Sequence, residues 1–382
     1  MEILINKIRK QTTGIRLAAK IAYMWPDRFN WIPFCLLLVT FSGCGDTAYP
    51  AGARYHFQPY VVLEGTDKVT TYSLPSDKSE QLDELLLPFF GTPREPAVKL
   101  ENAQADLDTL QLSSEQMSLG SKLFLSQCAL CHGKEGNGLG KSADKLDPKP
   151  RDFRHGKFKY VSTVRMEEGG HANTGQATYP SRADLFRTIK HGLPGSGMSS
   201  FNQDDKRIEA LVSYVIHLAL RGQVEYRLTR FWLEEDEKPN EKDVARELRE
   251  ILTQWAGDAR HTVTPSVPWE EIEREGNSTQ WAHGKQLFLG KAGCIDCHGK
   301  SGKALLEEVP SIAAMKDDWG KPIKPRSFVS DSFRGGDQPI DQFYRIKLGI
   351  KPSRMQAIDS SKFSDADIWH LVGYIRSLKG NP

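Results

Sequence analysis

Four of the six cysteines lie in two copies of one short motif, Cys-x-x-Cys-His. The first copy contains Cys128, Cys131 and His132, and the second contains Cys294, Cys297 and His298. Two thiols at this spacing, at the end of a helix, can bond the two vinyl groups of one porphyrin, and the adjacent histidine can bind its iron as the proximal ligand. The sequence therefore predicts two covalently bound haem c groups, one on each motif.

Paired cysteines at this spacing also occur in zinc sites and in thioredoxin-type redox motifs. A zinc site needs a further pair of cysteines or histidines at regular spacing, and no cysteine follows Cys297. A thioredoxin-type motif does not need a histidine after both copies. Haem attachment is therefore favoured over both alternatives.

Each haem iron needs a sixth ligand from elsewhere in the chain, and two methionines are the candidates. Met198 ends the segment GLPGSGM, and Met355 ends the similar segment GIKPSRM. A thioether is a soft ligand that favours ferrous iron, so His/Met coordination raises the reduction potential. His191 could compete with Met198, but Leu348 stands at its place in the second segment. We therefore expect histidine and methionine to bind both irons.

Two arginines are candidates for binding the haem propionates. Arg151 lies in the segment KPRDF and Arg326 in the matching segment KPRSF. The planar guanidinium group suits paired hydrogen bonds to a carboxylate. The alternative is that both arginines are solvated loop cations.

The two motifs belong to a longer internal repeat. Four blocks recur in one order: the segment around each motif, the KPR segment, the segment that ends in the candidate methionine, and a final apolar segment. Matching blocks in one order indicate a duplicated domain of about a hundred residues, an ordinary domain size. We place the first repeat at 116–223 and the second at 278–382.

Each repeat is expected to begin and end with a helix that frames the motif and the ligand loop. Ser113, Asn202, Asn277 and Ser364 each precede a Gln or Asp by three residues, the spacing of a capping box at a helix start. The final segments carry apolar residues at helical period, whereas the middle of each repeat is rich in Gly, Pro and Lys and is typical of loops.

The remaining segments are a connector and an arm. Residues 224–277 form an acidic linker in which 241–256 has the pattern of one amphipathic helix. Residues 44–115 contain several prolines and no sustained period, so we expect an extended N-terminal arm that packs on the first repeat.

Residues 1–43 are typical of a signal peptide. A basic stretch precedes an apolar run at 31–43, which is short for a membrane-spanning helix of about twenty residues. The segment Phe41-Ser42-Gly43-Cys44 resembles the lipobox of bacterial lipoproteins, although Phe41 stands where an aliphatic residue is usual. That resemblance implies cleavage before Cys44 and lipidation of its sulfur, so we expect a protein anchored on the periplasmic side of the inner or outer membrane. The alternative is a plain secretory signal with an incidental cysteine.

Composition excludes several classes of protein. The 382 residues are 39% hydrophobic, which fits neither a disordered chain nor a polytopic membrane protein. The net charge of +2 gives no reason to expect a nucleic acid partner. Charge is uneven along the chain, with +6 in the first repeat and +5 in the second against −6 in the connector and −7 in residues 46–115.

These residues carry a family resemblance. Each repeat resembles a class I cytochrome c domain, and the chain resembles a diheme c-type cytochrome. GLPGSGM is similar to the methionine-ligand loop of that family, whereas GIKPSRM departs from it at Lys351 and Pro352. The resemblance implies an all-α fold, with two tandem helical haem domains joined by a helical connector and one haem edge exposed in each domain.

The expected function is electron transfer between respiratory redox partners rather than catalysis, because His/Met ligation leaves no open position on either iron. The basic repeats favour partners with acidic docking faces and transient interfaces. The protein is expected to be either a free membrane-tethered carrier or a subunit of a respiratory membrane complex. The alternative is a diheme peroxidase-like enzyme, in which one haem is a relay and the other, near the unusual Met355 loop, is the catalytic centre. An enzyme of the sulfur-oxidising type would need a cysteine as distal iron ligand, and no cysteine remains for that role. Nothing in the sequence supports a module that only senses redox state.

Overall fold

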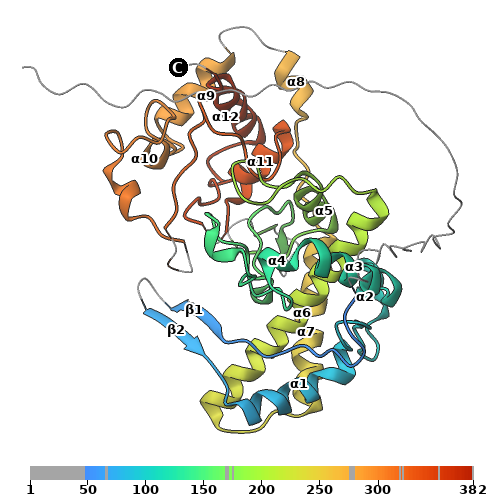
Figure 1. Ribbon diagram of the computed structural model, residues 1–382. Coiled ribbons are helices and arrows are strands. Elements are labelled where there is room, and N and C mark those ends of the chain that lie inside the picture. Colours follow the sequence, from blue (N-terminus) through green and yellow to red (C-terminus); the bar gives the residue numbers. More distant parts are fainter. Residues whose placement is uncertain are drawn as a thin grey trace, which may run out of the picture. The chain divides into compact units, whose positions relative to one another are not determined.

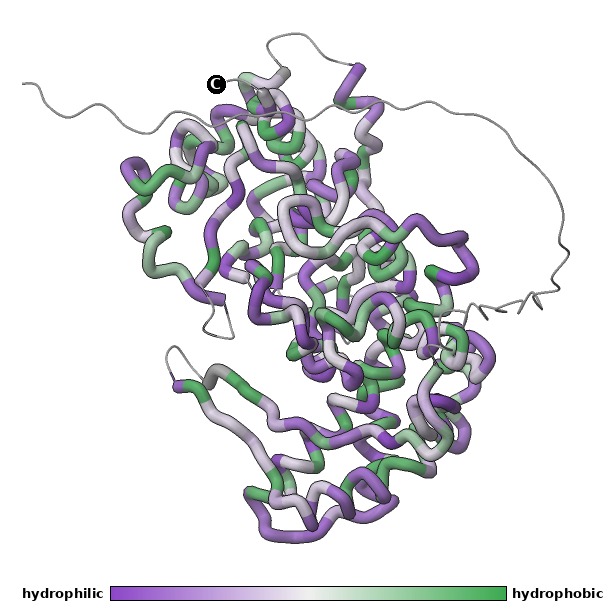
Figure 2. The backbone as a smooth tube through the Cα atoms, viewed as in Figure 1, coloured by the Kyte–Doolittle hydropathy of each residue, from purple (hydrophilic) through white to green (hydrophobic). Residues whose placement is uncertain are grey.

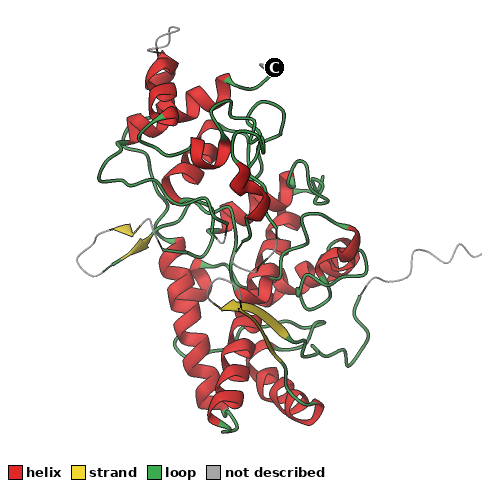
Figure 3. Ribbon diagram, turned by 90° about the vertical axis from the view of Figure 1, so that its left-hand side faces the viewer, coloured by secondary structure: helices red, strands yellow, loops and turns green. Residues whose placement is uncertain are grey.

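The computed structural model describes residues 48–64, 68–167, 172–173, 176–274, 280–317, 320, 322–351 and 353–380. Helices and loops make up nearly all of this part of the chain, with only two short antiparallel strand pairs (Figure 3). The expected all-α architecture is therefore confirmed. The signal peptide at 1–43 and the lipidation site Cys44 lie outside the described residues.

The arm is more regular than its sequence suggested. Its elements are β1 (Tyr60–Glu64), β2 (Lys68–Tyr72), α1 (Ser76–Phe90) and α2 (Gln104–Thr109). Strands β1 and β2 pair as an antiparallel hairpin, with Tyr60 opposite Tyr72. Helix α1 buries Leu82, Leu86 and Phe90 completely in the core shared with the first repeat, so the arm packs there as expected.

The first repeat is framed by two long helices with short elements between them. Its elements are α3 (Ser114–Gln127), α4 (Ala129–His132), the 3-10 helices η1 (Ala143–Lys145) and η2 (Phe153–His155), β3 (Arg165–Met166), β4 (Ala172–Asn173), α5 (Arg182–His191) and α6 (Asp205–Glu235). Helix α3 packs directly across α6 (Figure 1). The crossing is close because α3 carries Gly120 there: a Cβ atom at this position would lie 2.0 Å from the carbonyl oxygen of Ala210.

The second repeat has the same plan. Its elements are α9 (Gln280–Leu289), α10 (Ile295–His298), the 3-10 helix η3 (Pro310–Ala314), α11 (Pro339–Leu348) and α12 (Asp365–Ser377). Helix α9 crosses α12 at Gly284, where a Cβ atom would lie 2.0 Å from the carbonyl oxygen of His370. Gly284 occupies the place of Gly120 in the aligned motif segments, so the duplication extends to this close approach of the two helix backbones.

The connector consists of the end of α6, helix α7 (Glu241–Ala259) and helix α8 (Trp269–Arg274). Helix α6 continues through residue 223 into the acidic segment, and α7 packs back against it with Trp255 fully buried. The helix expected at 241–256 is therefore present. Hydrophobic and hydrophilic residues alternate along the helices, as expected where each helix buries one face (Figure 2). None of the helices in the described residues is long and apolar enough to span a membrane.

The N-cap residues in the structure can be compared with the helix starts predicted from the sequence. The side chain of Ser113 accepts a hydrogen bond from the backbone N–H of Gln116, and Ser364 forms a full capping box that starts α12. The start expected at Asn202 is wrong by two residues, because the Asp204 carboxylate caps α6 instead. An aspartate accepts this bond as well as an asparagine does, and spacing alone did not separate the two. Asn277 lies outside the described residues.

Candidate functional site

Each Cys-x-x-Cys-His motif lies on its own short turn of helix, α4 in the first repeat and α10 in the second. Cys128 ends α3 and precedes α4, and Cys294 precedes α10, so that each motif histidine is the last residue of its short helix. Gly133 and Gly299 follow with positive φ angles of 74° and 70°, a conformation that suits glycine at the end of a helix. The motif therefore has one geometry in both repeats.

The motif cysteines are free thiols and form no disulfide in the described part of the chain. Burial raises the pKa of Cys128 to about 12 and that of Cys294 to about 11. A redox dithiol of the thioredoxin type requires a lowered thiol pKa, so the surroundings of these cysteines do not favour that alternative. The described residues also contain no group of three or more potential ligands that could hold a metal ion, so they give no support to a zinc site.

Each motif histidine is held in one orientation. The Nδ1 atom of His132 lies 3.2 Å from the carbonyl oxygen of Arg151, and that of His298 lies 3.1 Å from the carbonyl oxygen of Arg326. Since a carbonyl only accepts, Nδ1 carries the proton in both rings. Burial lowers the pKa of His132, and it lowers that of His298 to about 4, so both rings are neutral at pH 7. The Nε2 lone pair is then available to bind a metal, as in metal sites where the other ring nitrogen donates to a carbonyl.

The two segments that end in the candidate methionines share one hydrogen-bond pattern. In the first, the Leu193 amide donates to the Met198 carbonyl at 2.9 Å, and the Ser196 amide donates to the Leu193 carbonyl at 3.1 Å. In the second, the Ile350 amide donates to the Met355 carbonyl at 2.8 Å, and the equivalent turn bond from Ser353 to Ile350 is also 2.8 Å. The departure from the family sequence therefore leaves the framework of the second loop intact.

A serine that the sequence reasoning did not single out supports each loop. The Ser196 hydroxyl donates to the carbonyl of Leu193 and accepts from the amide of Met198. Ser353 makes the same pair of bonds in the second loop. The signal was present in the sequence, because a serine stands two residues before the methionine in both aligned loops.

Both methionines are half-buried and pack against the core of their own repeat. His191, the competing candidate, is exposed at the end of α5. The two kinds of candidate ligand therefore differ in burial. Each methionine lies on a hydrogen-bonded loop beside the core of its repeat, whereas His191 faces solvent.

The structure gives Arg151 and Arg326 a role through their backbones, since their carbonyls orient the motif histidines. The side chain of Arg326 is half-buried; its Nη2 donates to the Ser332 carbonyl at 3.1 Å and its Nε faces Asp331 at 3.4 Å. Burial lowers the pKa of Arg151 to about 10. The KPR segment therefore contributes to the site in both repeats.

These features fit a haem c in each repeat. The donor set consists of two free thiols beside a neutral histidine whose Nε2 is available, with an aromatic ring stacked on that histidine. Phe153 stacks on His132 with ring centroids 4.5 Å apart, and Phe328 stacks on His298 at 4.2 Å. Both phenylalanines are buried, so each motif histidine has an apolar neighbour that shields it from water.

Comparison with known proteins agrees with this geometry. Residues 115–215 match the family model described as cytochrome c oxidase, cbb3-type, subunit III, and residues 281–379 match the cytochrome c family model. No curated protein matches the chain.

A similar solved structure is a chain of a reducing HAO-like protein complex from Kuenenia stuttgartiensis. Its sequence identity is 25% and its TM-score is 0.50, with 68% of this chain and 96% of that chain covered. Two family matches, each around one attachment motif, lead to one conclusion. The chain carries two cytochrome c-type domains and is a diheme c-type cytochrome, with one covalently bound haem c and its iron in each domain.

Proposed function

We propose that this protein carries electrons between respiratory redox partners on the periplasmic side of a membrane. The observation that carries the proposal is the matched pair of ligand loops, each braced by the same serine bonds and each ending in a half-buried methionine. A haem iron exchanges single electrons, and His/Met ligation leaves no position for substrate. The two domains then serve transfer rather than bond-making chemistry.

In this proposal His132 and Met198 bind the first iron, and His298 and Met355 bind the second. The motif cysteines, Cys128 with Cys131 and Cys294 with Cys297, hold the two porphyrins. Neutral imidazole and thioether are both uncharged ligands, so they favour the ferrous state and a raised potential. The buried phenylalanines Phe153 and Phe328 exclude water from the histidine side of each site.

The ligand assignment is tested by Met198→Ala and Met355→Ala in the haem-loaded protein. Each change should lower the potential of its own haem and open that ferrous iron to carbon monoxide. Met315→Ala is the matched control, because Met315 is half-buried in the second domain but has no counterpart in the first. An unchanged spectrum and potential in a ligand variant would show that its methionine does not bind iron.

A second candidate function is a diheme enzyme, in which one haem is the relay and the other is the catalytic centre. It is favoured by the likeness to a chain from a reducing HAO-like protein complex. An enzyme of this kind needs an iron with an open distal position. The carbon monoxide test on the unmodified protein separates the two functions, since a carrier should stay inert at both haems and an enzyme should bind the gas at one.

The charge distribution supports redox partners with acidic docking faces. The first domain carries a net charge of +6 and the second +5. Such charge acts mainly on the rate of encounter and is screened by salt. The match of the first domain to the subunit III model also favours a place in a respiratory membrane complex. Reduction by an acidic donor protein should slow as ionic strength rises, and a salt-independent rate would contradict this part of the proposal.

Membrane attachment is proposed through a lipid on Cys44, exposed after removal of residues 1–43. Cys44→Ala should release the protein into the soluble extracytoplasmic fraction. Cys35→Ala is the matched control, because Cys35 lies within the segment that is removed. A Cys44→Ala protein that stays in the membrane fraction would rule out the lipid as its anchor.

Arg151 and Arg326 are proposed to bind haem propionates. Burial of the Arg151 guanidinium weakens the competition from water, so a paired hydrogen bond from it to a propionate would be strengthened. Arg151→Lys keeps the charge but cannot form the paired bonds, so it should shift the pH dependence of the potential of the first haem. An unchanged pH dependence would reject the assignment.

A further inference from the structure

The second domain touches the ligand loop of the first domain. Arg334 donates from Nε to the carbonyl oxygen of Pro194 at 3.2 Å and from Nη2 to the carbonyl oxygen of Gly195. Arg326 lies against the same place, since a Cβ atom at Gly195 would be 3.1 Å from its Nη2 atom. Pro194 and Gly195 are the two central residues of the turn 193–196, which lies just before Met198 in the chain.

The turn has a conformation that exposes these two carbonyls. The Ser196 amide donates to the Leu193 carbonyl, so Pro194 and Gly195 take the two central places of the turn. Proline suits the first place, and Gly195, with a φ of 70°, suits the second, which requires a positive φ. Both residues are exposed, and their carbonyls are not used by the bonds that close the loop on itself. An outside donor can therefore hold the turn without disturbing the loop.

Further contacts keep Arg334 in position. The Arg187 guanidinium of the first domain faces the buried Asp341 carboxylate of the second at 3.1 Å. Gly335, with a φ of 75°, packs on the ring of Tyr160 in the first domain, at a place where a side chain would clash. The Arg345 guanidinium lies 5.8 Å from the centre of that ring. The residue next to Arg334 in the chain is thus fixed against the first domain.

The contact is asymmetric between the two ligand loops. In the second loop Arg354, which directly precedes Met355, donates from Nε to the Lys316 carbonyl at 3.0 Å, a bond within the second domain. The first loop has Gly197 at the place of Arg354 and receives its arginine from the other domain. One loop is therefore braced from its own domain and the other across the domain contact.

We propose that Arg334 is a positioning residue for the first iron: it clamps the 193–196 turn, so that the bond between Met198 and iron depends on the docked second domain. This inference rests on the proposed role of Met198. Two carbonyls held by one planar guanidinium fix the turn in both position and direction, which a single point contact cannot do. Loss of the clamp leaves the loop free to swing Met198 away from the metal.

The test compares Arg334→Gln and Arg334→Lys in the full-length, haem-loaded protein. Both variants should increase the fraction of first haem open to carbon monoxide by about tenfold, because each loses paired bonds from a charged donor. They should also weaken the near-infrared band of thioether-bound ferric haem. Lysine keeps the charge, so a purely electrostatic role would leave Arg334→Lys like the wild type, and that result would overturn the clamp.

Two controls make the result specific. Arg246→Gln removes the same charge from the exposed face of α7, in the connector, and should leave both haems unchanged. Arg354→Gln should affect the second haem and not the first. The two haems are distinguished by the ligand variants Met198→Ala and Met355→Ala, which assign each spectroscopic signal to one domain.

The outcomes separate this inference from the proposed function. If Met198→Ala leaves the first haem unchanged, the ligand assignment is wrong, and the inference about Arg334 is rejected together with it. If Met198→Ala opens the first haem but both Arg334 variants behave as wild type, the ligand assignment stands and the clamp alone is rejected. Opening of the first haem in all three variants supports both.

Discussion

The ring of Phe328 stacks on the imidazole of His298, with centroids 4.2 Å apart and 24° between the planes. The first domain repeats the arrangement with Phe153 and His132, at 4.5 Å and 23°. The carbonyl bond to Nδ1 and the stacked ring together limit each imidazole to one direction. An iron ligand fixed in this way needs little rearrangement when the metal changes its charge.

Replacing Phe328 by leucine should loosen His298 without removing an apolar residue from the site. We expect the free energy of unfolding to fall by about 1 kcal/mol, because the substitution repacks a buried position with a side chain of similar polarity. The low-spin ferric signal of the second haem in electron paramagnetic resonance should broaden, since the imidazole samples more orientations.

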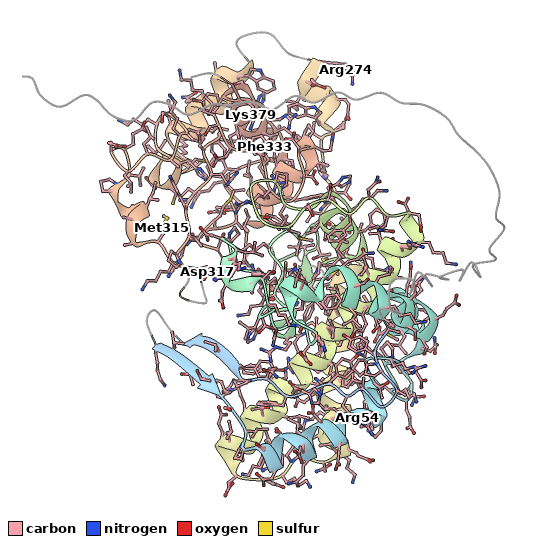
Figure 4. The ribbon with its side chains drawn as sticks, viewed as in Figure 1. Arg54, Arg274, Met315, Asp317, Phe333 and Lys379 are labelled. Atoms are coloured by element: carbon pink, nitrogen blue, oxygen red, sulfur yellow. The ribbon has the colours of Figure 1, made fainter. Side chains whose placement is uncertain are left out.

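Phe333→Leu is the matched control for this change. Phe333 lies 6.4 Å from the ring of Phe328 and also contacts Lys379, whose Nζ is 5.6 Å from its centre (both labelled in Figure 4). It has no stacking contact with His298, so the same loss of an aromatic ring should leave the ferric signal sharp. Equal broadening in both variants would contradict the role given to Phe328.

A glycine at a close helix crossing and a glycine with open space around it predict opposite effects for the same substitution. Gly284→Ala places a Cβ atom 2.0 Å from the His370 carbonyl, so α9 must move away from α12, at a cost of roughly 1–3 kcal/mol. Gly257→Ala, in the last turn of α7, meets nothing within 4 Å and should stabilise the protein by about 0.5–1 kcal/mol. Denaturant unfolding of both haem-loaded variants measures the difference. Two effects of the same sign would reject the packing argument.

The serine brace predicts a change at the second haem alone. Ser353→Ala removes the hydroxyl that joins the Ile350 carbonyl to the Met355 amide. A lost hydrogen bond costs about 1 kcal/mol, so the open fraction of the second ferrous haem should rise about fivefold in carbon monoxide binding. Ser196→Ala should do the same at the first haem. Ser126→Ala, on the exposed face of α3, should change neither haem, and an effect there would show that the assay reports general stability.

Comparison of the two repeats made the duplicated features predictable. The attachment motifs and the ligand loops recur at matched positions, and the structure gives both copies of each the same local hydrogen bonds. Gly120 with Gly284 could have been predicted in the same way. A glycine at equivalent helical positions in both copies indicates a close approach, because glycine is otherwise unfavourable inside a helix.

Features that occur once were harder to predict. Helix α1 contains Pro88, and a proline inside a helical pattern normally indicates an end or a kink. Pro88 removes one i→i−4 hydrogen bond near the end of α1. The helix continues to Phe90 because Leu82, Leu86 and Phe90 bury one face at a spacing of four residues. The bond from Arg334 to Pro194 joins residues 140 positions apart, whereas the matching loop of the second repeat is bonded within its own domain, by Arg354 to the Lys316 carbonyl. Nothing local in the sequence distinguishes Arg334 from a solvated arginine.

The last prediction concerns acid stability and a buried histidine outside the haem sites. His217 lies on α6 with its Nε2 atom 3.0 Å from the Tyr55 hydroxyl of the arm, and its ring stacks on Tyr214. Burial and the nearby Arg221 guanidinium lower the pKa of His217 to about 3. An unfolded histidine has a pKa of about 6.5. The unfolded chain therefore binds a proton between these values that the folded protein does not bind.

Stability should accordingly be full above about pH 6.5 and fall as the pH drops through this window. At pH 5 the loss should be on the order of 2 kcal/mol, one pKa unit being worth about 1.4 kcal/mol. His217→Asn keeps a polar partner for Tyr55 but does not titrate, so the difference in unfolding free energy between pH 7 and pH 5 should shrink by that amount. The exposed His191→Asn should leave the difference unchanged. If His217→Asn keeps the full acid sensitivity of the wild type, the lost stability arises at other groups and the buried neutral histidine is not its source.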